Sequence, residues 1–91
     1  MPDVLSEEEV ERQLPEGWEY EDGEIARTFE FDDYLDGVSF ASTVGEVAEE
    51  EFHHPEIVIG YQEVEVRFRT HEADGITEKD IRLAGLVNDE F

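Results

Sequence analysis

The sequence predicts an α+β fold, a two-layer domain in which a four-stranded antiparallel sheet has helices packed on one face. Apolar residues recur at helical spacing in some segments and alternate as in strands in others. The order of these segments is helix-strand-strand-helix-strand-strand-helix, and hairpin pairs separated by helices favour an antiparallel sheet. We expect a single domain over residues 1–91, without an internal linker.

The first helix is predicted from its capping signals. Ser6–Glu9 reads as a capping box, with Leu5 and Val10 placed as a hydrophobic staple. Pro15 and Gly17 end this helix after a few turns.

A β-hairpin follows. Residues 18–21 alternate between apolar and acidic side chains, and Asp22-Gly23 is a strong two-residue hairpin signal. The return strand is expected over residues 24–31. Arg27 shares the face of its apolar residues, so that face is not purely apolar.

The second helix is the longest predicted element. Asp32 or Asp33 can cap it. Its last turn, Glu49–Glu51, is acidic and opposes the helix dipole, which a protonated histidine nearby would offset. Its buried stripe is expected to comprise Tyr34, Val38, Ala41, Val44, Ala48 and Phe52.

Two further strands and a helix complete the fold. Ile57–Ile59 reads as a buried strand, and Tyr61 in the following turn is assigned to packing. The last strand, residues 64–70, should bury one face. A second capping box at Thr77–Asp80 opens the last helix. The opposite face of the last strand carries Glu65, Arg67, Arg69 and His71.

Composition limits the possible partners. The chain has 27 Asp and Glu against 6 Lys and Arg, a net charge of −21. Nucleic acids and anionic membranes require a basic footprint, so we expect neither as a partner. The hydrophobic content of 38% is periodic, which favours folding over disorder. An excess of carboxylates repels itself unless salt screens the charges, and in molar salt the Debye length is roughly 3 Å. The composition therefore predicts an acidic surface of the halophilic type.

Other classes of protein are disfavoured by what the sequence lacks. Without cysteine there is no disulfide, thiolate nucleophile or thiolate metal site. Met1–Val4 lacks the basic and apolar regions of a signal peptide, so we expect a cytoplasmic protein.

All three histidines lie in two places. His53 and His54 sit at a helix-to-strand turn, because Pro55 biases the residue before it toward an extended backbone. In such a turn both rings can converge on one site, and His71 closes the last strand. Histidine titrates near neutrality, so this grouping indicates proton-transfer chemistry.

These residues carry a family resemblance. The motif joins Glu49, His53-His54-Pro55-Glu56, the aromatic Tyr61, Thr70-His71-Glu72 and the segment 75–81 with Asp80. It resembles the pterin-4a-carbinolamine dehydratase family over at least residues 48–86. The resemblance implies a hydro-lyase that dehydrates 4a-hydroxytetrahydropterin, such as 4a-hydroxytetrahydrobiopterin, to quinonoid dihydropterin without a cofactor.

The resemblance also implies the site residues. His53, His54 and His71 would be catalytic, with general acid/base transfer suited to histidine. Acid and base are not assigned, although His54 and His71 are preferred as the proton-transfer pair, with His53 orienting the substrate. Supporting or substrate-binding roles fall to Glu49, Thr70, Glu72 and Asp80. Asp80 is explained equally well as a capping residue.

Two departures from the family pattern concern the substrate. Phe52 stands where a polar residue occurs in the family, and Ile57 where an aromatic residue often follows. Both affect stacking, so the physiological pterin stays open, including a molybdopterin-related role.

Two alternatives accompany this interpretation, together with an expected oligomeric state. A zinc site also fits three histidines near a carboxylate, but adjacent ligands are awkward for one tetrahedral ion, so we expect no metal. A non-catalytic pterin-binding, dimerisation or coactivator module is a second class of function. The resemblance implies a homodimer or homotetramer, and a sheet edge or the last helix can pair across a two-fold axis.

Overall fold

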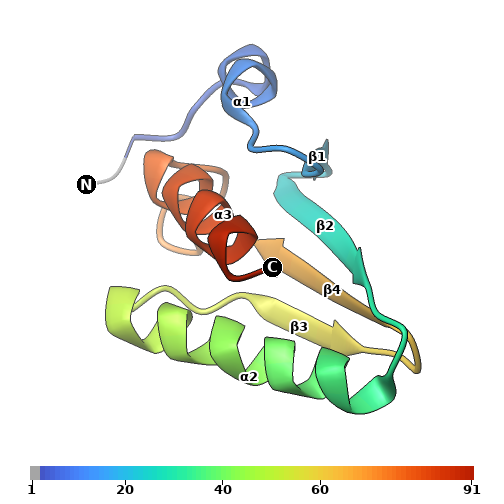
Figure 1. The fold of residues 1–91 in the computed structure, drawn as a ribbon. Helices are drawn as coiled ribbons and strands as arrows, with labels where there is room; N and C mark the ends of the chain where they lie inside the picture. The colour runs from blue at the N-terminus through green and yellow to red at the C-terminus, as the bar shows by residue number, and fades with distance from the viewer. Residues whose placement is uncertain (1–2) are drawn as a thin grey trace.

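The computed structural model describes residues 3–91 and contains seven elements in the expected order (Figure 1). Met1 and Pro2, part of the segment expected to lack a leader, lie outside the described residues. The helices and strands are α1 (Glu7–Gln13), β1 (Glu19–Glu21), β2 (Glu24–Glu30), α2 (Tyr34–Glu51), β3 (Glu56–Ile59), β4 (Glu63–Phe68) and α3 (Glu78–Glu90).

The four strands form one antiparallel sheet in the order β1-β2-β4-β3. Asp22 and Gly23 have φ angles of +49° and +82°, which a two-residue hairpin between β1 and β2 requires. Helices α2 and α3 lie on the same side of the sheet (Figure 1). The predicted α+β fold is therefore confirmed.

The core lies between the sheet and these helices. The inward residues of β2 and β4 alternate as predicted, and α2 and α3 supply the other side. The fully buried sheet residues are Ile25, Phe29, Val64, Val66 and Phe68, and α3 contributes Leu83, Ala84 and Val87.

The stripe predicted for α2 is right in its middle and wrong at its ends. Ala41, Val44 and Ala48 are buried, but Tyr34 and Phe52 are exposed because they lie at or beyond the helix termini. Phe40, which was outside the predicted stripe, packs against Phe29 with ring centroids 4.7 Å apart. A broad apolar face of α2 therefore contacts the sheet.

The prediction that residues 57–59 form a buried strand is also wrong. Val58 and Ile59 are 48% and 42% exposed. The reason is topological, because β3 pairs with β4 alone and forms an edge of the sheet. Tyr61, assigned to packing, is exposed as well.

Both capping boxes are confirmed by their hydrogen bonds. At α1 the Ser6 N–H donates to the Glu9 carboxylate and the Glu9 N–H donates to the Ser6 hydroxyl. Hydrogen bonding to Ser6 lowers the pKa of Glu9. Thr77 and Asp80 form the same reciprocal capping box at α3. Asp33 occupies the N-cap of α2 without a side-chain capping bond.

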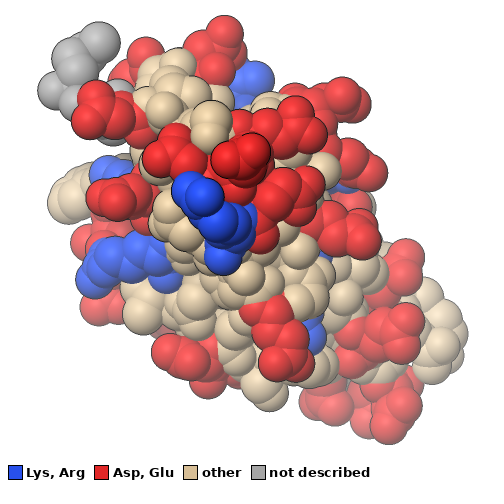
Figure 2. Space-filling model, turned by 90° about the horizontal axis from the view of Figure 1, so that it is seen from above, with Lys and Arg blue, Asp and Glu red and all other residues tan. Residues whose placement is uncertain are grey.

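The surface is acidic, as the composition predicts. Figure 2 shows a face of the molecule on which Asp and Glu side chains far outnumber Lys and Arg. Within residues 3–91, no helix has both the length and the apolar content needed to span a bilayer.

Candidate functional site

The turn after α2 sends the two adjacent histidines in different directions. Phe52 adopts the left-handed conformation at φ +54°, and its N–H and that of His53 bond to carbonyls of the last helical turn. His53 is thereby directed inward and is 8% exposed, whereas the His54 side chain is 61% exposed. The expected convergence of both rings on one site is not observed.

His53 belongs to a buried hydrogen-bond network with α3. Its Nε2 lies 2.5 Å from Oδ1 of Asp80, whose side chain is fully buried. The other carboxylate oxygen, Oδ2, accepts bonds from the Thr70 hydroxyl at 2.7 Å and the Thr77 N–H at 2.9 Å. A carboxylate only accepts hydrogen bonds, so Nε2 carries a hydrogen and the neutral ring would present its lone pair at Nδ1.

The position of the His53 ring is fixed from a second direction. The ring of Phe68 lies parallel to it, with 6.0 Å between the centroids and 4° between the planes. Phe68 is itself part of the core at the end of β4. Two independent contacts, one polar and one apolar, therefore hold His53 in place.

His54 and His71 line a common pocket of about 350 Å³. The two rings come from different segments, the turn before β3 and the loop after β4. Arg67 and Glu56 are cross-strand partners on β4 and β3 and both line the pocket, so it lies on the sheet face opposite Val66 and the core. The full lining is Glu24, His54, Glu56, Arg67, Arg69 and His71.

A carboxylate lies near one of these two histidines, and a tight loop carries the other. Glu49, in the last turn of α2, places Oε2 3.6 Å from Nε2 of His54. His71 lies in a tight loop closed by a bridge between Thr70 and Gly75, and its carbonyl accepts a bond from the Asp74 N–H at 3.2 Å. The charge of the acidic α2 terminus is further offset by an ion pair between Glu51 and Arg82.

The remaining candidate residues divide between structure and surface. The backbone N–H and C=O of Thr70 bond within the 70–75 loop, and its side chain bonds to Asp80, so Thr70 is engaged inside the protein. Glu72 is exposed and lies outside the pocket lining. The structure thus gathers His54, His71 and Glu49 at the surface and His53, Thr70 and Asp80 beneath it.

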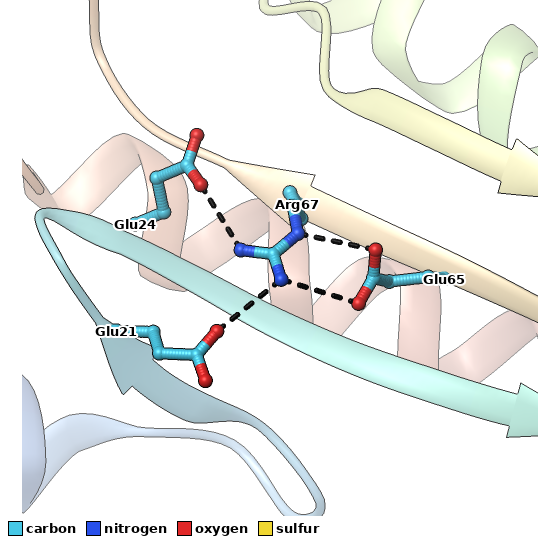
Figure 3. A network of polar contacts seen from close by, with 4 residues as sticks. All are labelled: Glu21, Glu24, Glu65 and Arg67. Carbon is cyan, nitrogen blue, oxygen red and sulfur yellow. Dashed lines mark hydrogen bonds and ion pairs between the residues drawn. The ribbon is translucent and has the colours of Figure 1, made fainter.

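Sequence reasoning did not assign Arg67 and Arg69 to the site. Strand alternation places both on the same face as His71, and this alternation could have identified them as residues of the site. Figure 3 shows Arg67 surrounded by three carboxylates, those of Glu65 on its own strand, Glu24 on β2 and Glu21 on β1. These hydrogen bonds raise the pKa of Arg67 above its ordinary value.

A larger hollow of about 660 Å³ lies at the other end of the strands, where Glu30 and Glu63 are paired across β2 and β4. Its lining contains no histidine, so it offers no group with an ordinary pKa near neutrality. Within the described residues 3–91, no group of three or more His, Cys, Asp or Glu side chains is arranged to hold a metal ion. The histidine pocket is therefore the better candidate for acid/base chemistry.

Comparison with known proteins places this geometry in context. A family model described as "Pterin 4 alpha carbinolamine dehydratase" matches residues 3–90. A protein of Natronomonas pharaonis named for pterin-4-alpha-carbinolamine dehydratase is 58% identical over 84 residues, which cover 92% of this chain and 91% of that protein. A protein of the same name from Halobacterium salinarum is 52% identical over 89 residues, 98% of each chain.

The fold is shared with solved structures. The crystal structure of a "transcriptional coactivator/pterin dehydratase" from Brucella melitensis superposes with a TM-score of 0.89 and 33% identity, covering 97% of this chain and 98% of that one. A pterin dehydratase-like RuBisCO assembly factor of the alpha-carboxysome is 19% identical with a TM-score of 0.66, which shows a similar fold. The two halophilic archaeal relatives agree with the salt-adapted surface predicted from composition.

Proposed function

Because the chain belongs to the pterin 4 alpha carbinolamine dehydratase family, a family of hydro-lyases, we propose that it dehydrates a 4a-hydroxytetrahydropterin to the quinonoid dihydropterin. The observation that carries this proposal is the shared pocket of His54 and His71, about 350 Å³ in volume. A pocket of this size suits a bicyclic ring system, since small-molecule sites typically begin at roughly 300 Å³.

The reaction needs two proton transfers. A general acid protonates the hydroxyl oxygen on C4a, the C–O bond breaks and water leaves. A general base removes the proton from the neighbouring ring nitrogen, and that electron pair forms the new C=N bond. Histidine serves either role near neutral pH, and positioned acid/base groups each contribute about 10²–10⁴-fold.

The geometry supports His54 and His71 as the acid/base pair and His53 as the positioning residue. The first two are exposed to the same pocket, whereas Nε2 of His53 is occupied by Asp80. Glu49 lies close to His54, with 3.6 Å between Oε2 and Nε2, and would pair with that ring when it is protonated. Which ring is the acid is not assigned, and the proposal requires no metal or organic cofactor.

The proposal is tested by stopped-flow absorbance with a synthetic 4a-hydroxytetrahydropterin, in roughly 2–4 M KCl to screen the surface charge. We expect His54→Ala and His71→Ala each to lower the rate constant by about 10²-fold or more. Glu49→Gln should lower it less, while Glu50→Gln, an equally acidic neighbour in the same helical turn, should leave it unchanged.

Two results would contradict the proposal. A folded protein that does not accelerate dehydration is not a dehydratase for that pterin, and binding without turnover would support the alternative of a pterin-binding or coactivator module. Loss of the acceleration on treatment with chelator would replace the metal-free mechanism by a metal-dependent one.

We also propose that the chain forms a homodimer or homotetramer. Val58 and Ile59 are exposed on the edge strand β3, which offers unpaired backbone groups and apolar surface to a second copy. Light scattering after size exclusion should give a dimer or tetramer mass in molar KCl, and Val58→Lys should reduce it to that of a monomer. A monomer mass for the unmodified chain would refute this assembly.

A further inference from the structure

Arg69 has an unsatisfied hydrogen-bond donor at the wall of the histidine pocket. It follows the last residue of β4 and precedes Thr70 and His71. Its Nε is buried and has no hydrogen-bond partner among the described residues 3–91. Buried polar groups in proteins are almost always paired, so an orphaned N–H on a charged side chain calls for an explanation.

The pocket is unusually rich in cations for this protein. It is lined by two of the chain's 6 Lys and Arg residues but by two of its 27 Asp and Glu residues. The face of the molecule shown in Figure 2 is dominated by carboxylates. A carboxylate-coated protein repels anions, so a local concentration of arginine is what would admit an anionic ligand.

The two arginines are not equally available. Arg67 donates to Glu65, Glu24 and Glu21 at 3.0–3.2 Å, which more than neutralises its charge (Figure 3). Among residues 3–91, Arg69 pairs with Asp74 alone, at 3.3 Å between Nη2 and Oδ1, and that carboxylate is 87% exposed. An exposed ion pair held by one hydrogen bond is weak, so Arg69 retains most of its capacity to bind another acceptor.

We propose that Arg69 is a specificity-determining residue of this pocket, which selects pterins carrying a carboxylate or phosphate on the side chain. The inference rests on the proposed function, because it names the substrate class of the same site. A guanidinium binds such groups with two parallel N–H bonds. The unpaired Nε–H would form one half of such a fork once the weak pair with Asp74 opens and the side chain turns toward the ligand. The cation would hold the anionic side chain while the ring lies against His54 and His71.

The test uses stable, fluorescent pterins in place of the unstable substrate. Dissociation constants are measured in about 2 M KCl for neutral 6-hydroxymethylpterin, its phosphate ester and pterin-6-carboxylate. The variants are Arg69→Gln, Arg69→Lys and Asp74→Asn, with Arg12→Gln as a control, because Arg12 carries the same charge on α1 and lies outside the pocket lining.

For the wild-type protein we expect tighter binding of the two anionic pterins than of the neutral one. Arg69→Gln should weaken binding of at least one anionic pterin about tenfold, as expected for a lost charge-assisted bond, and leave the neutral pterin unaffected. Arg69→Lys should recover part of the loss. Asp74→Asn should tighten anionic binding because it removes the competing carboxylate.

The outcomes for the different ligands and variants distinguish the possible failures from one another. Which anionic pterin loses affinity in Arg69→Gln distinguishes carboxylate from phosphate recognition. Equal weakening of neutral and anionic pterins, or no change in any variant, would overturn the role of Arg69 and leave the dehydratase proposal intact. Failure of the wild-type protein to bind any of the three pterins would overturn this inference, whereas the proposed function is decided separately by the stopped-flow assay.

Discussion

Replacing Asp80 by alanine removes the acceptor of three buried hydrogen bonds. The donors are Nε2–H of His53, the hydroxyl of Thr70 and the N–H of Thr77. The Thr70 and Thr77 hydroxyls lie 2.9 Å apart and share one bond, in which Thr77 donates because the Thr70 hydrogen goes to Asp80. Without Asp80, one of these two hydroxyl hydrogens loses its acceptor, so three donors are left without a partner.

The cost follows from that count. An unsatisfied buried donor costs about 1–3 kcal/mol, so three of them should lower the free energy of unfolding by about 3–9 kcal/mol. A domain of this size has about 5–15 kcal/mol in total. Asp80→Asn keeps the shape and one acceptor oxygen, and we expect it to cost about 1–2 kcal/mol.

Asp80→Asn should also reverse the tautomer of His53. If the amide oxygen keeps the bonds to Thr70 and Thr77, the amide nitrogen faces His53 as a donor, and Nε2 must then accept. The imidazole hydrogen would move to Nδ1. Nitrogen-15 NMR of the imidazole rings would detect the change directly.

Stability would be measured by urea unfolding in about 2 M KCl, with fluorescence of the buried Trp18 as the signal. Asp89→Ala is the control, because Asp89 is an exposed carboxylate on the same helix. If Asp80→Ala lies within about 1 kcal/mol of that control, the network does not carry the stability assigned to it. An unchanged His53 tautomer in Asp80→Asn would refute the hydrogen-bond assignment.

Three further predictions use the same urea assay. Gly85→Ala should raise the free energy of unfolding by about 0.5–1 kcal/mol, since the new methyl meets nothing within 4 Å. Gly17→Ala should lower it, because Gly17 has a φ of +85° and an added Cβ would lie 2.6 Å from Nε of Arg27. Phe52→Gly should stabilise by about 1 kcal/mol by relieving the left-handed conformation, and equal stability of Phe52→Gly and Phe52→Ala would contradict this. Dilution from about 2 M to about 0.1 M KCl should lower the urea midpoint because of the −21 charge, and an unchanged midpoint would refute the salt interpretation.

Local signals in the sequence predicted most of the fold. The capping boxes at Ser6 and Thr77 and the Asp22-Gly23 turn act through bonds within a few residues, so their outcome is encoded where they stand. The alternation of β4 likewise assigned each side chain to a face. Such features need no knowledge of distant contacts.

The features that were missed depend on long-range pairing or on a local backbone conformation that the sequence does not signal. The exposure of Val58 follows from β3 being an edge, which the strand order decides. The opposite directions of His53 and His54 depend on a left-handed conformation at Phe52, and nothing in the sequence signals it because glycine usually occupies such a position. The carboxylates around Arg67 come from three strands, so their meeting depends on register.

Asp80 serves the helix terminus and the histidine through its two oxygens at once. A residue that only closes a capping box tolerates exchange, since glutamate or glutamine commonly fills that place. A residue that only orients a ring can be offset by a neighbour. With both tasks on one carboxylate, a mutation that spoils either also spoils the other, and a single compensating change elsewhere cannot restore both. Random mutagenesis with selection for folded, active protein should therefore leave position 80 unchanged while the acidic surface around it drifts.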